Sequence, residues 1–159
     1  MRIGFYAGSF DPFTVGHLHI VKIACGLFDK VVVGIGINSS KTRRFDKEKM
    51  RVAISKLLKS EGLTNAEVIT FDGLTADVAK QCGASFLIRG LRNSMDYNDE
   101  ENLALINKEI SGLETIYLRS GNYGVISSTM VCELLKRGKD VSAYIPPHVI
   151  DVVTKKEEV

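Results

Sequence analysis

The chain has 159 residues, 45% apolar and 25% charged, which is an ordinary balance for a globular domain able to bury its own core. A formal net charge of only +2 excludes a strongly basic nucleic-acid binder, so an anion site must come from local placement of cations. No apolar run is long enough for a membrane span and no signal-peptide pattern opens the chain, so we expect a cytoplasmic protein without a membrane or nucleic-acid partner.

Short apolar runs alternate along the chain with segments of helical period. We expect strands at residues 3–7, 30–36, 67–71, 85–88 and 115–118. We expect helices at residues 17–28, from a cap at 46 to about 60, at 75–81, 96–110 and 127–138, and from 146 onward. This alternation predicts an α/β protein with a Rossmann-like, doubly wound, parallel five-stranded sheet and helices on both faces.

Several helices carry apolar faces or end signals. The faces consist of Leu18, Val21, Cys25 and Phe28 in the first helix, Met50, Ile54, Leu57 and Leu58 in the second, and Leu103, Ile106 and Ile110 in the helix at 96–110. Asp46 is a typical N-cap, Gly138 suits the position after a helix end, and Pro146-Pro147 suits a first turn.

The sequence shows no sign of a second domain or of a fold stabilised by disulfides or metal ions. It has no internal repeat or Pro/Gly-rich linker, and only residues 155–158 look like a solvated tail, so we expect one domain over residues 1–159. Cys25, Cys82 and Cys132 are far apart and form no CxxC pair. We therefore expect neither a disulfide framework nor a zinc site, and place the cysteines in or near the core.

The loop after the first strand, residues 8–17, is the first candidate site, because open parallel sheets bind ligands beyond the carboxyl ends of their strands. Gly8 and Gly16 allow close backbone approach, and Ser9 offers a hydroxyl. His17 starts a helix, where free amides favour an anion and an imidazole can donate to a phosphate oxygen. The alternative is a plain turn with a structural histidine. His19, about 200° further around a helix, is expected to be structural or exposed.

The loop after the second strand contains three cations within residues 38–44. Lys41 is a mobile point charge suited to bridging phosphates, although such a run can also be an ordinary solvated loop. We interpret Arg43 and Arg44 as solvated or oligomer-contact residues.

Two further loops carry groups that suit phosphates. Arg89 and Arg92 follow the fourth strand, and their planar forks match phosphate oxygens. The alternative for this pair is an ion-pair network with Asp96, Asp99, Glu100 and Glu101. Residues 123–129 follow the fifth strand and combine three hydroxyls with a helix start, although an ordinary serine N-cap would explain one of them.

These motifs resemble a known family. GSFDPFTVGH at residues 8–17 resembles the signature of the nucleotidyltransferase superfamily with the (H/T)xGH hallmark, here Thr14-Val15-Gly16-His17. IRGLR at residues 88–92, followed by Asp96, Tyr97 and Glu100, resembles the bacterial phosphopantetheine adenylyltransferase subfamily. The likeness extends over roughly residues 2–153 in length and motif order. Ser9 replaces the usual threonine, and residues 119–122 replace a stretch that usually contains proline.

The resemblance implies transfer of the adenylyl group of ATP to 4′-phosphopantetheine by direct in-line attack, giving dephospho-coenzyme A and pyrophosphate, with Mg²⁺ brought in by ATP. It also implies a homohexamer and feedback binding of coenzyme A. The implied catalytic residues are His17, Lys41 and Arg89. The implied ATP-binding residues are Ser9, Phe10, His17, Gly90, Leu91, Arg92, Glu100, Tyr123, Gly124, Val125, Ile126, Ser127, Ser128 and Thr129. The implied substrate-binding residues are Ser9, Lys41, Leu74, Thr75 and Arg89.

Two alternatives stay open at this point. One is adenylyl or cytidylyl transfer to another phosphate-bearing acceptor within the same superfamily. The other is a non-catalytic nucleotide-binding module. A dedicated protein site for a metal is not expected, because Mg²⁺ binds largely through phosphates and water.

Overall fold

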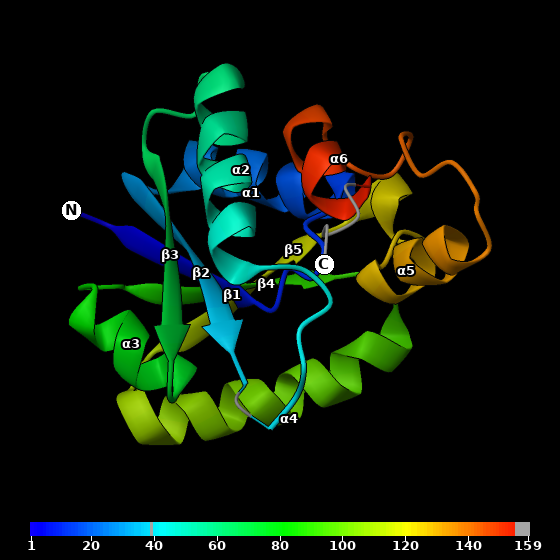
Figure 1. The fold of residues 1–159 in the computed structure, drawn as a ribbon. Coiled ribbons are helices and arrows are strands. Elements are labelled where there is room, and N and C mark those ends of the chain that lie inside the picture. Colours follow the sequence, from blue (N-terminus) through cyan, green and yellow to red (C-terminus); the bar gives the residue numbers. More distant parts are fainter. Residues whose placement is uncertain (39, 155–159) are drawn as a thin grey trace.

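The computed structural model describes residues 1–38 and 40–154, apart from the side chains of residues 94 and 95, so the expected solvated tail lies outside the described residues. Its centre is a parallel sheet in the order β3-β2-β1-β4-β5 (Figure 1). The strands are β1 Ile3–Gly8, β2 Lys30–Ile37, β3 Ala66–Asp72, β4 Phe86–Leu91 and β5 Glu114–Arg119. The strand order runs outward from β1 in both directions, so the carboxyl ends of β1 and β4 flank the topological switch point.

Helices cover both faces of the sheet, as the sequence predicts (Figure 1). One face carries α1 Val15–Leu27, α2 Lys47–Ser60, α5 Ser128–Lys136 and α6 Pro147–Thr154. The other carries α3 Thr75–Gln81 and α4 Ser94–Ser111, and a short 3-10 helix, η1 Gly121–Tyr123, follows β5. Two hydrophobic clusters result, because neighbouring residues of a buried strand point to opposite faces. Phe5 belongs to the smaller cluster, and Tyr6 belongs to the larger one.

The helix ends agree with the end signals in the sequence. Asp46 accepts a hydrogen bond from the Lys49 amide at 2.8 Å and caps α2, whose four predicted face residues are all buried. Gly138 has a φ of +71° directly after the C-cap of α5, a conformation that favours glycine. Pro147 opens α6.

Two expectations about the elements need correction. The fourth strand does not stop at residue 88, because its pairing with β5 continues from Arg89 opposite Tyr117 to Leu91 opposite Arg119. Arg89 therefore lies on a strand and not in the following loop. On the first helix, Ile20 and Ala24 are fully packed while Cys25 is only half-buried, since α1 is covered on more than one side.

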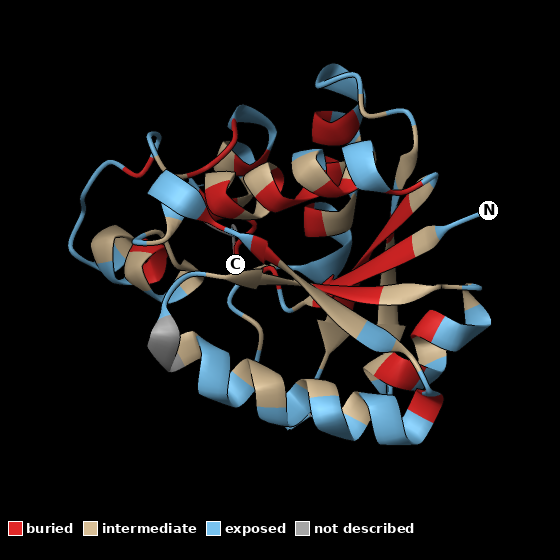
Figure 2. Cartoon of the chain, turned by 180° about the vertical axis from the view of Figure 1, so that it is seen from behind, coloured by how far each residue is buried: buried red, intermediate tan, exposed pale blue. Residues whose placement is uncertain are grey.

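Helix α4 leaves several large apolar side chains exposed, whereas α1 and α2 each leave one, Leu27 and Val52 (Figure 2). The exposed ones are Tyr97, Leu103, Leu105, Ile106 and Ile110. Within the described ranges, no helix combines the length and apolar character needed to cross a bilayer.

Candidate active site

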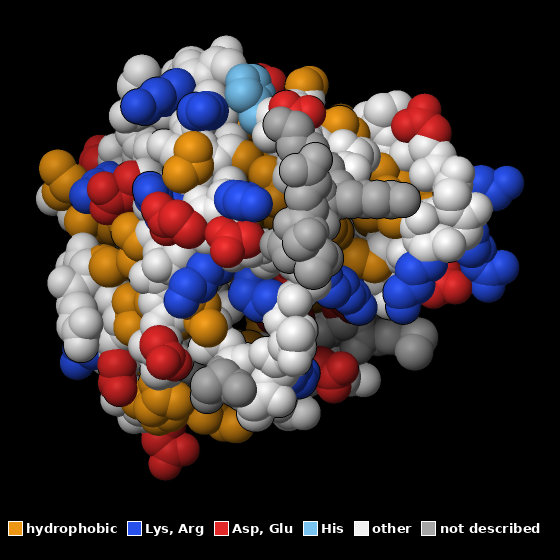
Figure 3. All heavy atoms as spheres, in the orientation of Figure 1, with side chains coloured by type: hydrophobic (Ala, Val, Ile, Leu, Met, Phe, Trp, Pro, Cys, Tyr) orange, Lys and Arg blue, Asp and Glu red, His pale blue; other side chains and the backbone are white. Residues whose placement is uncertain are grey.

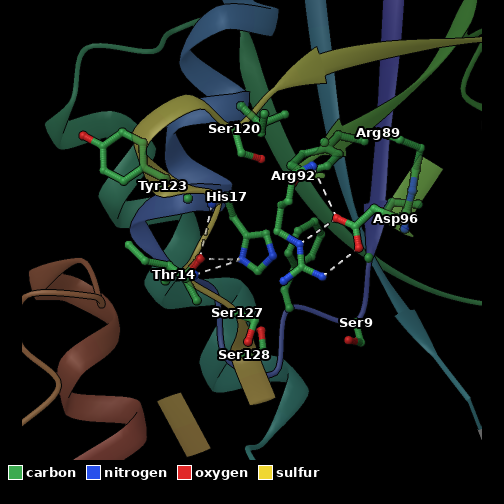
Figure 4. Close-up of a pocket in the computed structure, with 18 of the residues that line it drawn as sticks. Ser9, Thr14, His17, Arg89, Arg92, Asp96, Ser120, Tyr123, Ser127 and Ser128 are labelled. Atoms are coloured by element: carbon green, nitrogen blue, oxygen red, sulfur yellow. Dashed lines mark hydrogen bonds and ion pairs between the residues drawn. The ribbon is translucent and has the colours of Figure 1, made fainter. Parts of the chain in front are cut away.

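A cavity of about 290 Å³ opens at the carboxyl ends of β1 and β4, where the strand order reverses. Its walls come from the loop after β1, the ends of β4 and β5, and the start of α5 (Figure 4). The predicted site residues in its lining are Ser9, Phe10, His17, Arg89, Gly90, Arg92, Glu100, Tyr123, Ile126, Ser127, Ser128 and Thr129. Three of the four predicted loops thus converge on one cavity.

His17 is held by the start of its own helix. The Thr14 N–H donates to His17 Nδ1 at 2.9 Å, and the His17 N–H donates to Thr14 Oγ1 at 3.3 Å, which makes a reciprocal capping box (Figure 4). Because Nδ1 accepts a backbone hydrogen, the neutral ring carries its proton on Nε2, the other ring nitrogen. The motif residues Thr14 and His17 therefore fix both the orientation and the tautomer of the imidazole.

The surroundings of His17 keep it neutral. Its ring contacts those of Phe10 and Phe13, with centroid distances of 4.9 and 5.3 Å. Burial lowers the pKa of His17 from 6.5 to about 3, and the charges of Arg89 and Arg92 act in the same direction. At neutral pH the site thus contains an uncharged hydrogen-bond donor. The Phe10 side chain is 2% exposed, and its ring packs against the imidazole. The Phe10 backbone adopts a φ of +45°.

Arg89 is positioned by three hydrogen bonds. Its Nε and Nη2 donate to the two carboxylate oxygens of Glu100 at 2.7 and 2.8 Å, and its Nη1 donates to the Ala7 carbonyl at 2.6 Å. Three of the five N–H groups of a guanidinium are used in this way, so two remain for a ligand. The predicted alternative of an ion pair with a nearby carboxylate is therefore confirmed for Arg89, and Glu100 is the partner that orients it.

Arg92 makes a similar pair with Asp96. Its Nε and Nη2 donate to the Asp96 carboxylate at 2.9 and 3.2 Å, and both side chains border the cavity (Figure 4). The neighbouring Ser120 is 6% exposed, and its N–H donates to the Leu91 carbonyl at 3.1 Å, which joins the ends of β4 and β5.

The start of α5 closes the opposite wall of the cavity. Ser127 is the N-cap and accepts a hydrogen bond from the Met130 N–H at 3.0 Å, so the N-cap alternative is confirmed for this serine. Ser128 Oγ donates to the Pro12 carbonyl at 2.7 Å, which ties α5 to the loop after β1. On the rim, the rings of His19 and Tyr123 lie 4.9 Å apart, so His19 has the structural place that the sequence predicts.

Other predicted residues lie outside the lining of this cavity. They are Lys41, Leu74, Thr75, Leu91, Gly124 and Val125. Lys41 is exposed on the loop after β2, in which Ser39 is not described. Thr75 borders a second, smaller cavity that shares Arg89 and Glu100 with the main one, and Leu74 is exposed beside it.

The expectation that Arg43 is a solvated residue is wrong, whereas the oligomer-contact alternative stays a prediction. Its side chain is only 15% exposed and bonds to the backbone of two loops. Arg44 is an exposed residue, but its guanidinium donates to Cys132 Sγ at 3.4 Å. Sequence reasoning could not distinguish these arginines from solvated ones, because a run of cations carries no information on loop-to-loop contacts.

Sequence reasoning also missed four residues of the lining, namely Tyr6, Ala7, Ile20 and Ser120. Tyr6 and Ile20 looked like ordinary core positions, and burial does raise the pKa of the Tyr6 phenol. Ser120 follows β5 at the carboxyl edge of the sheet, and that position was the signal that could have identified it.

The arrangement suits transfer of a phosphate-bearing group. Two arginines, each paired with a carboxylate of the same lining, face one cavity together with a neutral imidazole and a helix start. These groups provide fixed hydrogen-bond donors for phosphate oxygens. Across the described portions of the chain, His, Cys, Asp and Glu side chains form no group of three that could hold a metal ion. The described cysteines are free thiols.

Comparison with known proteins agrees with this chemistry. A family model for cytidylyltransferase-like proteins matches residues 5–134. A phosphopantetheine adenylyltransferase of Streptococcus mutans is 41% identical, with 99% of this chain and 95% of the relative covered. Another, from Bacteroides fragilis, is 42% identical over 92% of this chain and 97% of the relative.

A solved structure supports the fold separately. The Plasmodium falciparum nicotinic acid mononucleotide adenylyltransferase, solved in complex with NaAD, superimposes with a TM-score of 0.69 over 96% of this chain and 94% of that chain. Its sequence is only 15% identical, so this likeness concerns the fold alone. With about two-fifths of the residues identical over nearly the full length of curated relatives, the chain belongs to the phosphopantetheine adenylyltransferase family.

Proposed function

We propose that this protein transfers the adenylyl group of ATP to 4′-phosphopantetheine, giving dephospho-coenzyme A and pyrophosphate, a step of coenzyme A biosynthesis. Family membership supports the substrates. The observation that carries the chemistry is the imidazole of His17, which is neutral, fixed by Thr14 and located in the same cavity as Arg89 and Arg92.

The reaction needs no general base, because the attacking phosphate of 4′-phosphopantetheine is already an anion. One of its oxygens forms a bond to the α-phosphorus of ATP while the bond from that phosphorus to the departing pyrophosphate breaks in line. His17 donates its Nε2 hydrogen to an α-phosphate oxygen as charge develops there. Catalysis is then positioning plus charge stabilisation by a fixed donor.

Each substrate has a part of the site that suits it. The two free N–H groups of Arg89, the Ser9 hydroxyl and Lys41 bind the phosphate of 4′-phosphopantetheine. The cavity that Thr75 borders next to Arg89 suits the pantetheine arm. On the ATP side, Gly90 and Ile126 border the nucleotide, while Arg92, Tyr123 and the start of α5 receive the β- and γ-phosphates. ATP enters as its Mg²⁺ complex, and the cation is held by phosphates and water.

The exposed row of Leu103, Ile106 and Ile110 on α4 supports assembly of several copies, because exposed apolar surface on one side of a helix is typical of interaction sites. We propose the homohexamer that the family resemblance implies. Coenzyme A contains the same phosphopantetheine arm as the acceptor, so feedback binding would compete at the acceptor site. A cytoplasmic location, where ATP is available, belongs to the same proposal.

The test is pyrophosphate release with Mg²⁺-ATP or Mg²⁺-CTP against 4′-phosphopantetheine, nicotinamide mononucleotide and glycerol 3-phosphate. We expect release only with ATP and 4′-phosphopantetheine. Release with another pair would keep nucleotidyl transfer and refute the acceptor. Binding of ATP without release for any acceptor would favour a non-catalytic nucleotide-binding module.

A further inference from the structure

Arg43 joins two loops that meet at the mouth of the cavity. Its Nη1 donates to the carbonyl of Ser9, in the loop after β1, at 2.7 Å. Its Nε donates to the carbonyl of Phe45, at the end of its own loop, at 3.1 Å. The Arg43 side chain is 15% exposed, and its bond to Phe45 is partly buried, whereas its bond to the exposed Ser9 lies at the surface. A planar guanidinium can reach both carbonyls from one fixed position, which a lysine ammonium cannot do.

Asp11 supports the same junction from the other side. Its two carboxylate oxygens accept hydrogen bonds from the backbone N–H groups of Arg44 at 2.8 Å and Phe45 at 2.9 Å. The Asp11 carboxylate also lies 3.6 Å from Arg43 Nη2, a buried atom that has no hydrogen-bond partner among the described residues. The Asp11 and Arg43 side chains are 14% and 15% exposed, respectively. The loop after β2 is thus fastened to the loop after β1 at residues 43–45.

Lys41 lies two residues before this junction, exposed and with only a backbone hydrogen bond to Asn38 among the contacts of the described residues. In Figure 3, Lys and Arg side chains gather around this loop on the face that it crosses. A long, flexible lysine loses much entropy on binding a phosphate unless its backbone is already in place. Fixing residues 43–45 against the Ser9 backbone limits the volume that the Lys41 side chain, two residues away, can sample.

We infer that Arg43 is a positioning residue, which holds the Lys41 loop against the Ser9 loop so that both groups meet the phosphate of the acceptor. The inference rests on the proposed function, in which Lys41 and Ser9 bind that phosphate. Arg43 itself does not touch substrate. Its contribution acts through Lys41, and that dependence makes the inference testable.

The experiment is a double-mutant cycle on pyrophosphate release with Arg43→Ala, Lys41→Ala and the double variant. We expect Arg43→Ala to lower kcat/KM for 4′-phosphopantetheine about tenfold in the native background and less than about twofold once Lys41 is gone. The KM for ATP should stay within about twofold of native. Equal factors in the two backgrounds, or no loss at all, would overturn the inference.

Controls separate this result from loss of charge or loss of fold. Arg44→Ala removes the same charge one residue away without touching the Ser9 carbonyl, and should retain native kcat/KM within about twofold. Arg43→Lys keeps the charge but lacks the fork, so it should lose most of the activity that Arg43→Ala loses. If the two arginines give equal losses, or if Arg43→Lys is fully active, the effect is one of charge and the inference fails.

Hydrogen exchange tests the junction without any substrate. The amides of Arg44 and Phe45 should exchange at least about tenfold faster in Arg43→Ala than in the native protein, whereas the amides of β3 should be unchanged. Native exchange rates at both amides would refute the positioning role. A wild type that is inactive with ATP and 4′-phosphopantetheine refutes the proposed function instead, and exchange then decides the junction by itself.

Discussion

At the scale of the residue, His17 shows how one short motif sets a tautomer, an orientation and a charge state. The motif brings Thr14 and His17 to the first turn of α1, where the Thr14 N–H occupies Nδ1 and leaves the Nε2 hydrogen for a ligand. The sequence predicted the residue and its place at the helix start. It could not predict the charge state, because that follows from the packing of Phe10 and Phe13 and from the arginines across the cavity.

Replacing His17 by alanine is expected to remove a donor that acts in the transition state. We expect kcat to fall by about 10²–10³, the usual loss for one fixed donor to a developing oxyanion, with each KM changed by less than about threefold. Steady-state kinetics with both substrates measures this. A rise in the KM for ATP that matches the loss in kcat/KM would mean that His17 mainly shapes the loop.

Because His17 is buried in its neutral form, the unfolding free energy is expected to depend on pH. Its pKa is depressed from 6.5 to about 3 in the folded protein, so below pH 6.5 the unfolded chain binds a proton that the folded chain does not. This difference destabilises the folded state as the pH falls from 6.5 toward 3, and it has no effect above pH 6.5. Between pH 7 and pH 5 the His17→Gln variant should therefore lose about 1–2 kcal/mol less unfolding free energy than the native protein. Urea unfolding at the two pH values measures the difference, and equal losses would show that His17 titrates normally.

At the scale of the element, the sequence predicted the boundaries best where a side chain itself makes the cap. Asp46 at α2, Gly138 after α5 and Pro147 at α6 were readable because each acts on its nearest backbone. The end of β4 was misplaced, since a strand continues as long as its neighbour pairs with it, and that pairing is not local. The same limit applies to Arg43, whose partners Ser9 and Asp11 are more than thirty positions away.

A substitution at the start of α5 can distinguish a role of Ser127 in stability from a role in binding ATP. Ser127→Ala removes the cap bond to the Met130 amide and should lower the unfolding free energy by about 1 kcal/mol. If this helix start also receives the outgoing phosphates, the KM for ATP should rise several-fold while that for 4′-phosphopantetheine changes little. Ser142→Ala, on an exposed turn that does not line the cavity, is a suitable control. A loss of stability with an unchanged KM for ATP would leave α5 as a purely structural wall.

At the scale of the whole molecule, the α/β class, the parallel sheet and the convergence of loops at one edge were all predictable, because alternating strands and helices leave few topologies open. The sequence also predicted an apolar row on α4 but could not say whether the fold would cover it. In the chain by itself the three residues of this row, Leu103, Ile106 and Ile110, are 43%, 54% and 47% exposed, so the fold of one chain does not cover them. The simplest explanation is that neighbouring copies of the chain bury this row at an interface of the assembly.

Ile106→Lys tests this assignment by placing a charge in the middle of the row. If α4 lies between copies, the buried ammonium would lack a partner and the assembly should dissociate, with the mass measured by light scattering falling toward the 17.5 kDa of one chain. Because Ile106 is more than half exposed in the single chain, the variant should keep its circular dichroism and its fold. Lys56→Glu, on the exposed side of α2, changes charge without touching the row and should keep the native mass. An unchanged mass for Ile106→Lys would show that copies meet elsewhere, and α4 would then require another partner to explain why its apolar side chains stay at the surface.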